Sequence, residues 1–280
     1  MRIKIWGCRG TLPSPGAHTV RYGGNTTCVE IRDQHNFCTV IDAGSGLRIL
    51  GKQMLKDDDC TEICLMLTHA HWDHLMGFPF FIPAYLSKYK INVCGVASAR
   101  QYLRNILARQ LEAPYFPVDF SQLKAQFNFG CNVPGNKLCH RLQIDSIPLS
   151  HPNGGYGYKF TENGKSFVFL TDNELGHIHE GGKQFEDYVE FCKGAEILLH
   201  DAQYTDKEYE KTITWGHSTY RQTLRLATEA GVKRLGLIHH DPDRTDDEID
   251  EIVAKLKKQI ESDCSNIDIF AGSDGLELTL

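Results

Sequence analysis

Apolar residues along the chain fall into short runs that alternate between the period of a strand and the period of a helix. Residues 2–6 alternate apolar and polar side chains, and 63–68 form a continuous apolar run typical of a buried strand. The capping pair Thr219/Gln222 marks the start of one helical segment. Strands alternate with helices in both halves of the chain, which predicts a single α/β domain over residues 1–280.

Turn and cap residues divide these runs into elements. Asn163-Gly164 stands between two alternating segments, and this dipeptide is a strong signal of a β-hairpin. Ser45 and Ser98 stand where a side-chain oxygen could cap a helix. The expected strands are 2–6, 26–31, 37–41, 63–68, 91–96, 138–149 (one or two strands), 156–160, 166–170, 195–199, 234–238, 267–270 and 276–280. The expected helices are 45–56, 98–111, 185–192, 219–230 and 245–260.

Composition is that of an ordinary globular protein, with 41% hydrophobic and 24% charged residues. No apolar run is long enough to span a bilayer, and the N-terminal residues lack the apolar core of a signal peptide. The ten cysteines form no CxxC pair and are expected to be reduced thiols, so we expect a cytoplasmic protein. A net charge of −6 argues against binding of long nucleic acids.

The chemistry of the chain concentrates directly after the run 63–68. His69, His71, Asp73 and His74 stand within six residues there. A polar loop with solvated histidines is the alternative, but imidazole nitrogen with carboxylate oxygen is a ligand set for Zn²⁺, Mn²⁺ or Fe. The density of the cluster therefore predicts one or two metal ions at the end of this strand.

Metal-binding residue types recur at the ends of other expected strands. Functional residues of α/β proteins gather in the loops beyond strand ends. One such histidine is more often structural, but five separate segments that each carry one would be improbable if they were independent. The recurring residues are His151, Asp172, Asp201, His239 and His240, with His217 just before a helix.

The order HxHxDH at 69–74, followed by His151, Asp172 and His239, resembles the metallo-β-lactamase-fold hydrolases. The resemblance covers nearly the whole chain and includes the Asp-Ala-Gly strand end at 42–44. It implies a four-layered αβ/βα sandwich, formed as a single α/β domain, with a dinuclear metal site at one edge.

The same resemblance implies two divalent metal ions, of which Zn²⁺ is the first expectation and Mn²⁺ or Fe the alternatives. It assigns the ligands of one ion as His69, His71 and His151, those of the other as Asp73, His74 and His239, and Asp172 as the bridge between them. His240 is an alternative to His239. Asp42 and Asp201 would either orient a metal-binding histidine or only shape a strand end.

The stretch Trp215-Gly216-His217-Ser218-Thr219 resembles the ribonuclease Z-type phosphodiesterases. This resemblance implies that His217 is a general acid that protonates the departing alkoxide, and it joins Asp73 as a candidate catalytic residue. The alternative is that His217 only precedes a helix cap. A tight hairpin stands between His151 and Asp172, where ribonuclease Z often carries a long arm for gripping tRNA.

These features favour a metal-dependent phosphodiesterase for a small anionic phosphodiester. The segments IWGCRGTLPSPG, APYFPV and IHHDPDRTDDE resemble small-substrate relatives that include cyclic-nucleotide phosphodiesterases, so a 3′,5′-cyclic nucleotide is the first expectation. The alternatives are RNA 3′-end processing, hydrolysis of thioesters, lactones or sulfate esters on the same fold, and a metal-loaded sensor. The sequence leaves the oligomeric state open, and a homodimer is the commonest oligomer for a soluble enzyme. The candidate substrate contacts are Arg9, Arg21, Tyr22, Tyr115 and Phe116, with Asn25 as a candidate site amide.

Overall fold

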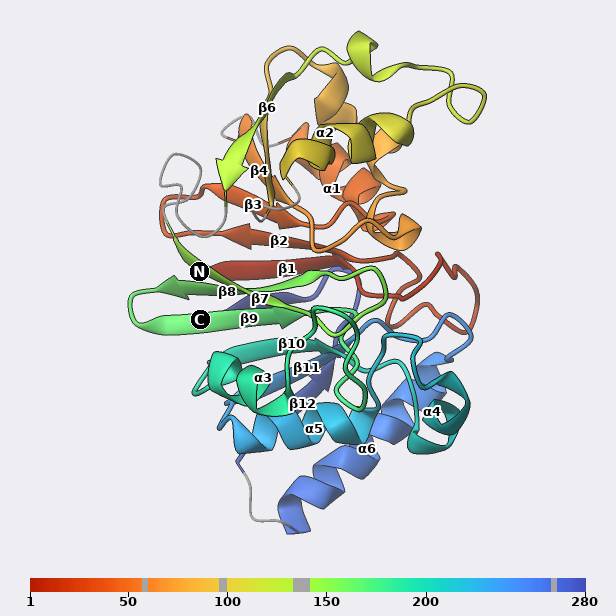
Figure 1. Ribbon diagram of the computed structural model, residues 1–280, viewed down its shortest axis with the longest axis vertical. Helices are drawn as coiled ribbons and strands as arrows, with labels where there is room; N and C mark the ends of the chain where they lie inside the picture. The colour runs from red at the N-terminus through yellow and green to blue at the C-terminus, as the bar shows by residue number, and fades with distance from the viewer. Residues whose placement is uncertain (57–59, 96–99, 133–141, 263–265) are drawn as a thin grey trace.

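Two β-sheets lie face to face in the centre of the molecule, and helices cover the outer face of each (Figure 1). The computed structural model describes residues 1–56, 60–95, 100–132, 142–262 and 266–280. The seven-stranded sheet has the order β13-β1-β2-β3-β4-β5-β6, and the six-stranded sheet has the order β12-β11-β10-β9-β8-β7. The predicted four-layered α/β sandwich in a single domain is confirmed.

The strands and helices have the following bounds. The first sheet contains β1 (Arg2–Gly7), β2 (Cys28–Arg32), β3 (Cys38–Ile41), β4 (Glu62–Met66), β5 (Lys90–Gly95), β6 (Gln126–Asn132) and β13 (Glu277–Thr279). The second contains β7 (Gln143–Pro148), β8 (Tyr156–Glu162), β9 (Lys165–Leu170), β10 (Ile197–Asp201), β11 (Arg234–Ile238) and β12 (Asp268–Ala271). The α-helices are α1 (Gly46–Met54), α2 (Arg100–Arg109), α3 (Phe185–Cys192), α4 (Asp206–Thr212), α5 (Tyr220–Glu229) and α6 (Asp246–Ser262).

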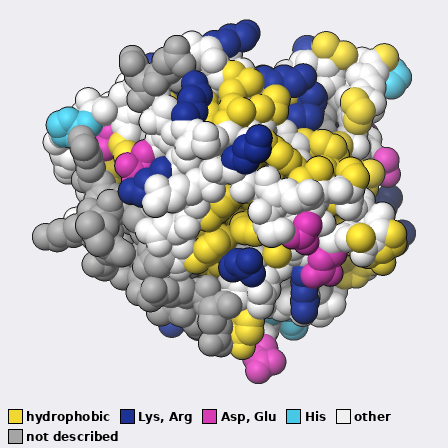
Figure 2. Space-filling view, turned by 90° about the horizontal axis from the view of Figure 1, so that it is seen from above, with side chains coloured by type: hydrophobic (Ala, Val, Ile, Leu, Met, Phe, Trp, Pro, Cys, Tyr) yellow, Lys and Arg dark blue, Asp and Glu magenta, His cyan; other side chains and the backbone are white. Residues whose placement is uncertain are grey.

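Three apolar layers hold the sandwich together. The middle layer lies between the sheets and includes Ile5, Phe167 and Leu199. The outer layers pack Leu47 of α1 and Leu224 of α5 against their own sheets. The end of the molecule that carries α1 and α2 shows apolar side chains interspersed with Lys and Arg (Figure 2). Because each sheet is buried on both faces, its central strands are continuous apolar runs.

Strand direction brings the candidate site residues to one edge. Strands β3 to β6 are parallel to one another, and so are β9 to β12. Their carboxyl ends therefore lie at the same edge of each sheet. The segments that follow β4, β7, β9 and β11 carry the histidines and aspartates assigned as metal ligands.

Of the turn and helix-cap signals in the sequence, some are confirmed and one is wrong. The hairpin at Asn163-Gly164 joins β8 to β9, and both turn residues have positive φ. Thr219 and Gln222 form the expected capping box of α5. Ser45, however, makes no cap hydrogen bond, because its hydroxyl accepts instead from the backbone N–H of Thr26.

Two elements were not expected, and two expectations lie at least partly outside the described residues. Helix α4 has no buried residue, so it shows no apolar stripe. Strand β6 follows an aromatic loop and was also missed. The expected cap at Ser98 and the start of the expected strands in 138–149 lie outside the described residues. Among the described helices, none combines the length and apolar character that crossing a membrane requires.

Candidate metal centre

The HxHxDH segment forms a tight turn directly after β4. Trp72–His74 make a single turn of 3-10 helix, and His71 precedes it with extended backbone. This turn buries Asp73 and His74, whereas Trp72 keeps 76% of its surface exposed. The apolar strand thus delivers the segment to the sheet edge, and the turn directs the acidic and imidazole groups inward.

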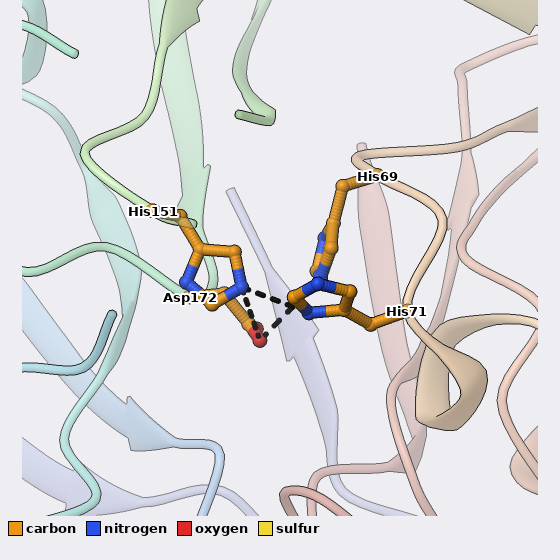
Figure 3. A group of neighbouring side chains, drawn as sticks. All are labelled: His69, His71, His151 and Asp172. Carbon is orange, nitrogen blue, oxygen red and sulfur yellow. Dashed lines mark hydrogen bonds and ion pairs between the residues drawn. The ribbon is translucent and has the colours of Figure 1, made fainter. Parts of the chain in front are cut away.

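Three overlapping groups of potential ligand atoms meet at this edge among the described residues, and two of them have four members. In each group the ligand atoms lie within 4.8 Å of one another. The first group is His69, His71, His151 and Asp172, and the second is Asp73, His74, Asp172 and His239. The third, of three members, is Asp201, His217 and His239. In the first group, His69 and His71 approach from one side and His151 from the other, with Asp172 between them (Figure 3). The structure therefore brings together all seven residues assigned as ligands from the sequence, in the expected division.

Asp172 belongs to both groups because its two oxygens face different histidines. Oδ1 lies 3.2 Å from Nε2 of His74 and 3.2 Å from Nε2 of His239. Oδ2 lies 3.6 Å from Nε2 of His69 and 3.8 Å from Nε2 of His151. A carboxylate in this position can bridge two cations.

The chemistry of the donor set fits divalent cations. Nε2 of His69 and Nε2 of His74 are buried and have no hydrogen-bond partner. A buried polar atom without a partner costs free energy, and a cation at these positions would remove that cost. Asp73 and Asp172 add buried negative charge at the same place. Zn²⁺, Mn²⁺ and Fe all accept nitrogen with carboxylate oxygen.

The carboxylates of the site favour an extra proton on His239. Burial alone would lower the pKa of His239, but the nearby carboxylates of Asp172 and Asp73 outweigh it and raise that pKa to about 9. Burial alone would raise the pKa of Asp172, yet His239, His74 and His69 hold it well below its ordinary value. Burial lowers the pKa of His69 well below the ordinary value, so this imidazole is neutral. Metal binding must therefore displace the extra proton of His239.

Asp42 fixes the orientation of one candidate ligand. Its Oδ2 accepts a hydrogen bond from Nδ1 of His74 over 2.8 Å. Oδ1 accepts from the backbone N–H of Thr68 over 2.8 Å, and the Thr68 hydroxyl donates to Oδ2 over 2.7 Å. With Nδ1 occupied in this way, Nε2 of His74 is left for a cation. The interpretation of Asp42 as an orienting residue is therefore supported.

Other ligands are oriented by groups that the sequence did not reveal. Nδ1 of His151 donates to the carbonyl of Gly216 over 3.0 Å. Nδ1 of His239 donates to Oε1 of Gln203 over 3.0 Å. A backbone carbonyl leaves no side-chain signal, and a glutamine has many other uses. Only the position of Gln203, two residues after Asp201, could have drawn attention to it.

The loop after β1 also reaches the site. The backbone N–H of Thr11 donates to Oδ2 of Asp73 over 3.0 Å. A Cβ atom at Gly10 would lie 2.4 Å from Nδ1 of His239, so only glycine fits there. The turn-rich segment near the N-terminus thus closes one side of the second group, which sequence reasoning did not predict.

His217 lies beside both groups. Its ring stacks on that of His239 with centroids 4.7 Å apart, and it lies 5.4 Å from the ring of His151. Nδ1 of His217 donates to Oδ2 of Asp201 over 2.8 Å. Thr219 supplies the helix cap, so capping does not explain His217. Asp201 orients His217 rather than a predicted metal ligand.

Three of the candidate substrate contacts are used elsewhere. Arg9 is fully buried, and its guanidinium donates to three backbone carbonyls, those of Gly23, Asp241 and Arg244. The guanidinium of Arg21 and the hydroxyl of Tyr22 donate to the carboxylate of Asp250 on α6. The expectation that Arg9 contacts substrate was wrong, because its side chain is fully buried. Arg21 and Tyr22 tie the N-terminal loop to α6, and their contact with substrate stays a prediction.

Two further expectations can be settled by their contacts. The amide of Asn25 donates to Asp274 over 2.8 Å, so it does not reach the metal site. Nε2 of His240 donates to the carbonyl of Gly272 over 3.0 Å and therefore faces away from the candidate ligands. His239 is the member of the His239-His240 pair that joins the site.

One hollow adjoins the first ligand group, and a second lies next to it. The first has a volume of about 590 Å³ and is lined by His69 and His71 together with apolar residues such as Leu149. The second, of about 640 Å³, is lined by aromatic residues that include Tyr115 and Phe116. Ala70 and Ile106 line both hollows. These two aromatic residues therefore remain candidates for substrate contact.

Known proteins share this sequence pattern and this fold. The chain is 25% identical over 290 residues to ribonuclease Z of Thermoplasma acidophilum, with 88% of each chain covered. The structure superposes on human tRNase Z, short form, with a TM-score of 0.66 and 19% identity, covering 100% of this chain and 99% of that one. It superposes on a diphosphatase from the PhnP family with a TM-score of 0.68 and 17% identity, covering 100% and 97%.

A family assignment follows from the sequence itself. Residues 39–240 match the family described as the beta-lactamase superfamily domain. That span contains every residue of the two ligand groups and also His217. The chain therefore belongs to the beta-lactamase superfamily.

Proposed function

We propose that the protein is a dinuclear metal-dependent phosphodiesterase that hydrolyses a small anionic phosphodiester, with a 3′,5′-cyclic nucleotide as the first candidate. The observation that carries this proposal is the position of Asp172, whose two oxygens face two separate histidine groups. His217 lies beside those groups with its Nδ1 held by Asp201. The names of the relatives, ribonuclease Z, tRNase Z and diphosphatase, support hydrolysis at phosphorus.

The proposed ligands are His69, His71 and His151 for one cation, Asp73, His74 and His239 for the other, and Asp172 for both. Two bound cations would polarise the phosphoryl oxygens and make water a nucleophile at neutral pH. Zn²⁺ is our first choice, and Mn²⁺ or Fe would be accepted by the same atoms.

The remaining chemistry belongs to the side chains. The leaving alkoxide of a phosphodiester is strongly basic, so protonation by a neighbouring imidazolium lowers the barrier. We assign this role to His217. Asp201 accepts a hydrogen bond from Nδ1 of His217, so Nε2 of His217 points away from the Asp201 carboxylate. Asp73 holds its place through the backbone N–H of Thr11.

The connection between His151 and Asp172 supports a small substrate. It contains the β8–β9 hairpin with a two-residue turn, which leaves no room for an extended arm. The adjoining hollow of about 590 Å³ has the size of a small-molecule site. Net charge is −6, which disfavours the backbone of a long nucleic acid.

A substrate panel tests the proposal. Protein reconstituted with Zn²⁺ or Mn²⁺ is assayed against cyclic nucleotides, bis(p-nitrophenyl) phosphate, a thioester, a lactone and a sulfate ester. We expect turnover of the phosphodiesters. Activity restricted to the thioester, lactone or sulfate ester would overturn the assignment, and metal binding without any turnover would favour a sensor.

The role of His217 has its own test. His217→Ala should retain both cations and lose about 100-fold or more of turnover on a cyclic nucleotide, whose leaving group needs a proton. The loss should be much smaller on bis(p-nitrophenyl) phosphate, because nitrophenolate leaves unprotonated. His35→Ala, an exposed histidine on the β2–β3 turn, is the matched control. Equal losses on both substrates would contradict the general-acid role.

A second candidate function is processing of RNA 3′ ends. The similarity to ribonuclease Z extends over 88% of the chain, which favours this alternative over other esters. A short RNA hairpin with a 3′ extension would test it. Cleavage of that RNA at a higher kcat/KM than the cyclic nucleotide would make RNA the substrate.

A further inference from the structure

Glu174 is a buried carboxylate that the proposed chemistry does not use. It stands two residues after Asp172, and 1% of its surface is exposed. We propose that Glu174 is a positioning residue that holds the backbone of 214–216 and thereby orients His151 and His217. This inference rests on the proposed function and names a further residue on which that function depends.

The carboxylate of Glu174 accepts four hydrogen bonds. Oε1 accepts from the hydroxyl of Tyr209 over 2.7 Å and from the backbone N–H of Thr214 over 2.8 Å. Oε2 accepts from the backbone N–H of Gly216 and from Nε2 of His179, each over 2.8 Å. Hydrogen bonds to an ionised carboxylate are stronger than bonds between neutral groups. Glu174 is therefore anchored by α4 and by its own segment, and it binds two amides of one short loop.

The loop needs an external anchor because its backbone conformation is unfavourable. Thr214 has φ of 79°, a left-handed value that a β-branched residue rarely adopts, and Gly216 has φ of 94°. Such residues persist only where the surroundings determine them. The two N–H groups that point to Glu174 belong to these same two residues.

The anchored peptide contacts a proposed metal ligand directly. The N–H of Gly216 donates to Glu174, while its carbonyl accepts from Nδ1 of His151 over 3.0 Å. A Cβ atom at Gly216 would lie 2.0 Å from that same nitrogen. Movement of the Gly216 peptide must therefore move the imidazole of His151, or break its hydrogen bond. His217 is the next residue and moves with it.

A second connection fastens the same two segments. The hydroxyl of Ser218 donates to the carbonyl of Asn173 and accepts from the backbone N–H of Leu175 over 3.0 Å. Asn173 and Leu175 flank Glu174 in the chain. The segment that carries Asp172 is thus joined to the segment that carries His217 at two places, and Glu174 supplies the charged one.

Amide hydrogen exchange tests this arrangement without any substrate. In Glu174→Gln one oxygen becomes an NH2 group, which faces N–H groups and cannot accept from them. We expect the amides of Thr214 and Gly216 to exchange about tenfold to a hundredfold faster, because one of them loses its acceptor and the other is left with a neutral one. Amides of α5 should be unchanged, which shows that the protein remains folded. Glu210→Gln, at an exposed position on α4, is the matched control.

Kinetics supply the second readout. At a metal concentration that saturates both sites, Glu174→Gln should lose about 100-fold in kcat on the substrate with the poor leaving group, with less change in KM. Metal titration should show weaker binding at the group that contains His151, because the Gly216 carbonyl orients that ligand. The loss on the nitrophenyl ester should be smaller, as for His217→Ala. Tyr209→Phe removes one donor and leaves three, so it should give an intermediate loss.

The outcomes separate this inference from the proposed function. Wild-type protein that hydrolyses no phosphodiester would overturn the proposed function, whereas unchanged exchange at Thr214 and Gly216 would overturn the anchoring role of Glu174. Faster exchange together with equal losses on both substrates would show that Glu174 supports the fold without positioning His217, and would also overturn the inference.

Discussion

Asp42→Asn should weaken the binding of one of the two cations and leave the fold intact. The substitution changes Oδ2, which accepts from Nδ1 of His74, into an NH2 group. Asparagine keeps the size of the side chain and tolerates the left-handed backbone at this position, where φ is 61°. Its remaining oxygen still accepts from the N–H of Thr68, and the Thr68 hydroxyl can turn to accept rather than donate.

The expected magnitude follows from the tautomer of His74. An NH2 group beside Nδ1 favours the ring form with its proton on Nε2, the buried atom that lies 3.2 Å from Oδ1 of Asp172. A cation then competes with that proton. Loss of an orienting partner typically costs 10- to 100-fold in metal affinity, which corresponds to about 1.4–2.7 kcal/mol.

Titration with Zn²⁺ against a chromophoric chelator measures the two affinities separately. We expect the site that contains His74 to weaken by about 10- to 100-fold and the other site to weaken less, since His74 is the candidate ligand that Asp42 contacts directly. Asp42 reaches His69 indirectly, through the Thr68 hydroxyl, which lies 3.1 Å from Nδ1 of His69. Asp243→Asn, an exposed aspartate, is the control for the loss of one charge. Two sites of wild-type affinity, or equal weakening of both, would refute the orienting role of Asp42.

Three other predictions follow from features of the site. Gly216→Ala places a methyl group against Nδ1 of His151, in a backbone with φ of 94° that alanine rarely adopts. Metal analysis should therefore show loss of the cation bound by the first group. Two retained cations would contradict this prediction. Removal of the metal with a chelator should lower the melting temperature. A bound cation adds about 4 kcal/mol to the free energy of unfolding when free metal exceeds Kd a thousandfold. Equal melting temperatures with and without chelator would argue against a metal site. Burial lowers the pKa of His240 to about 3, so the unfolded chain, with an imidazole pKa near 6.5, takes up a proton that the folded protein excludes. The free energy of unfolding should therefore fall as pH drops below 6.5, by about 1.4 kcal/mol between pH 7.5 and 5.5. Urea unfolding of metal-loaded His240→Gln should show a free energy of unfolding that depends less on pH over this range.

The ligand set could be predicted from the sequence because its signal is local. His69 to His74 follow an apolar run, and Asp172 and His239 follow others, so strand ends identify them. Their division into two groups came from resemblance to a family, since spacing alone cannot place residues from two sheets together. The fold followed in the same way from apolar runs, except for α4, which has no buried residue, and β6, which follows an aromatic loop.

The groups that orient the ligands could not be predicted. The Gly216 carbonyl and the Thr11 N–H act through the backbone, which every residue shares. For Arg9 the residue type suggested the wrong role, because an arginine beside glycines is a plausible phosphate contact. Only its burial and its three carbonyl acceptors show that it is structural. Tertiary contacts, rather than residue type, decide these cases.

The two ligand groups draw residues from both sheets of the sandwich. Each bound cation would join atoms that follow β4, in one sheet, to atoms that follow β9 or β11, in the other. The cations would then act as a cross-link between the two halves of the chain at the edge of the inter-sheet core. A substitution that loosens the apolar layer around Phe167, which is not itself a ligand, should consequently also appear as weaker metal binding.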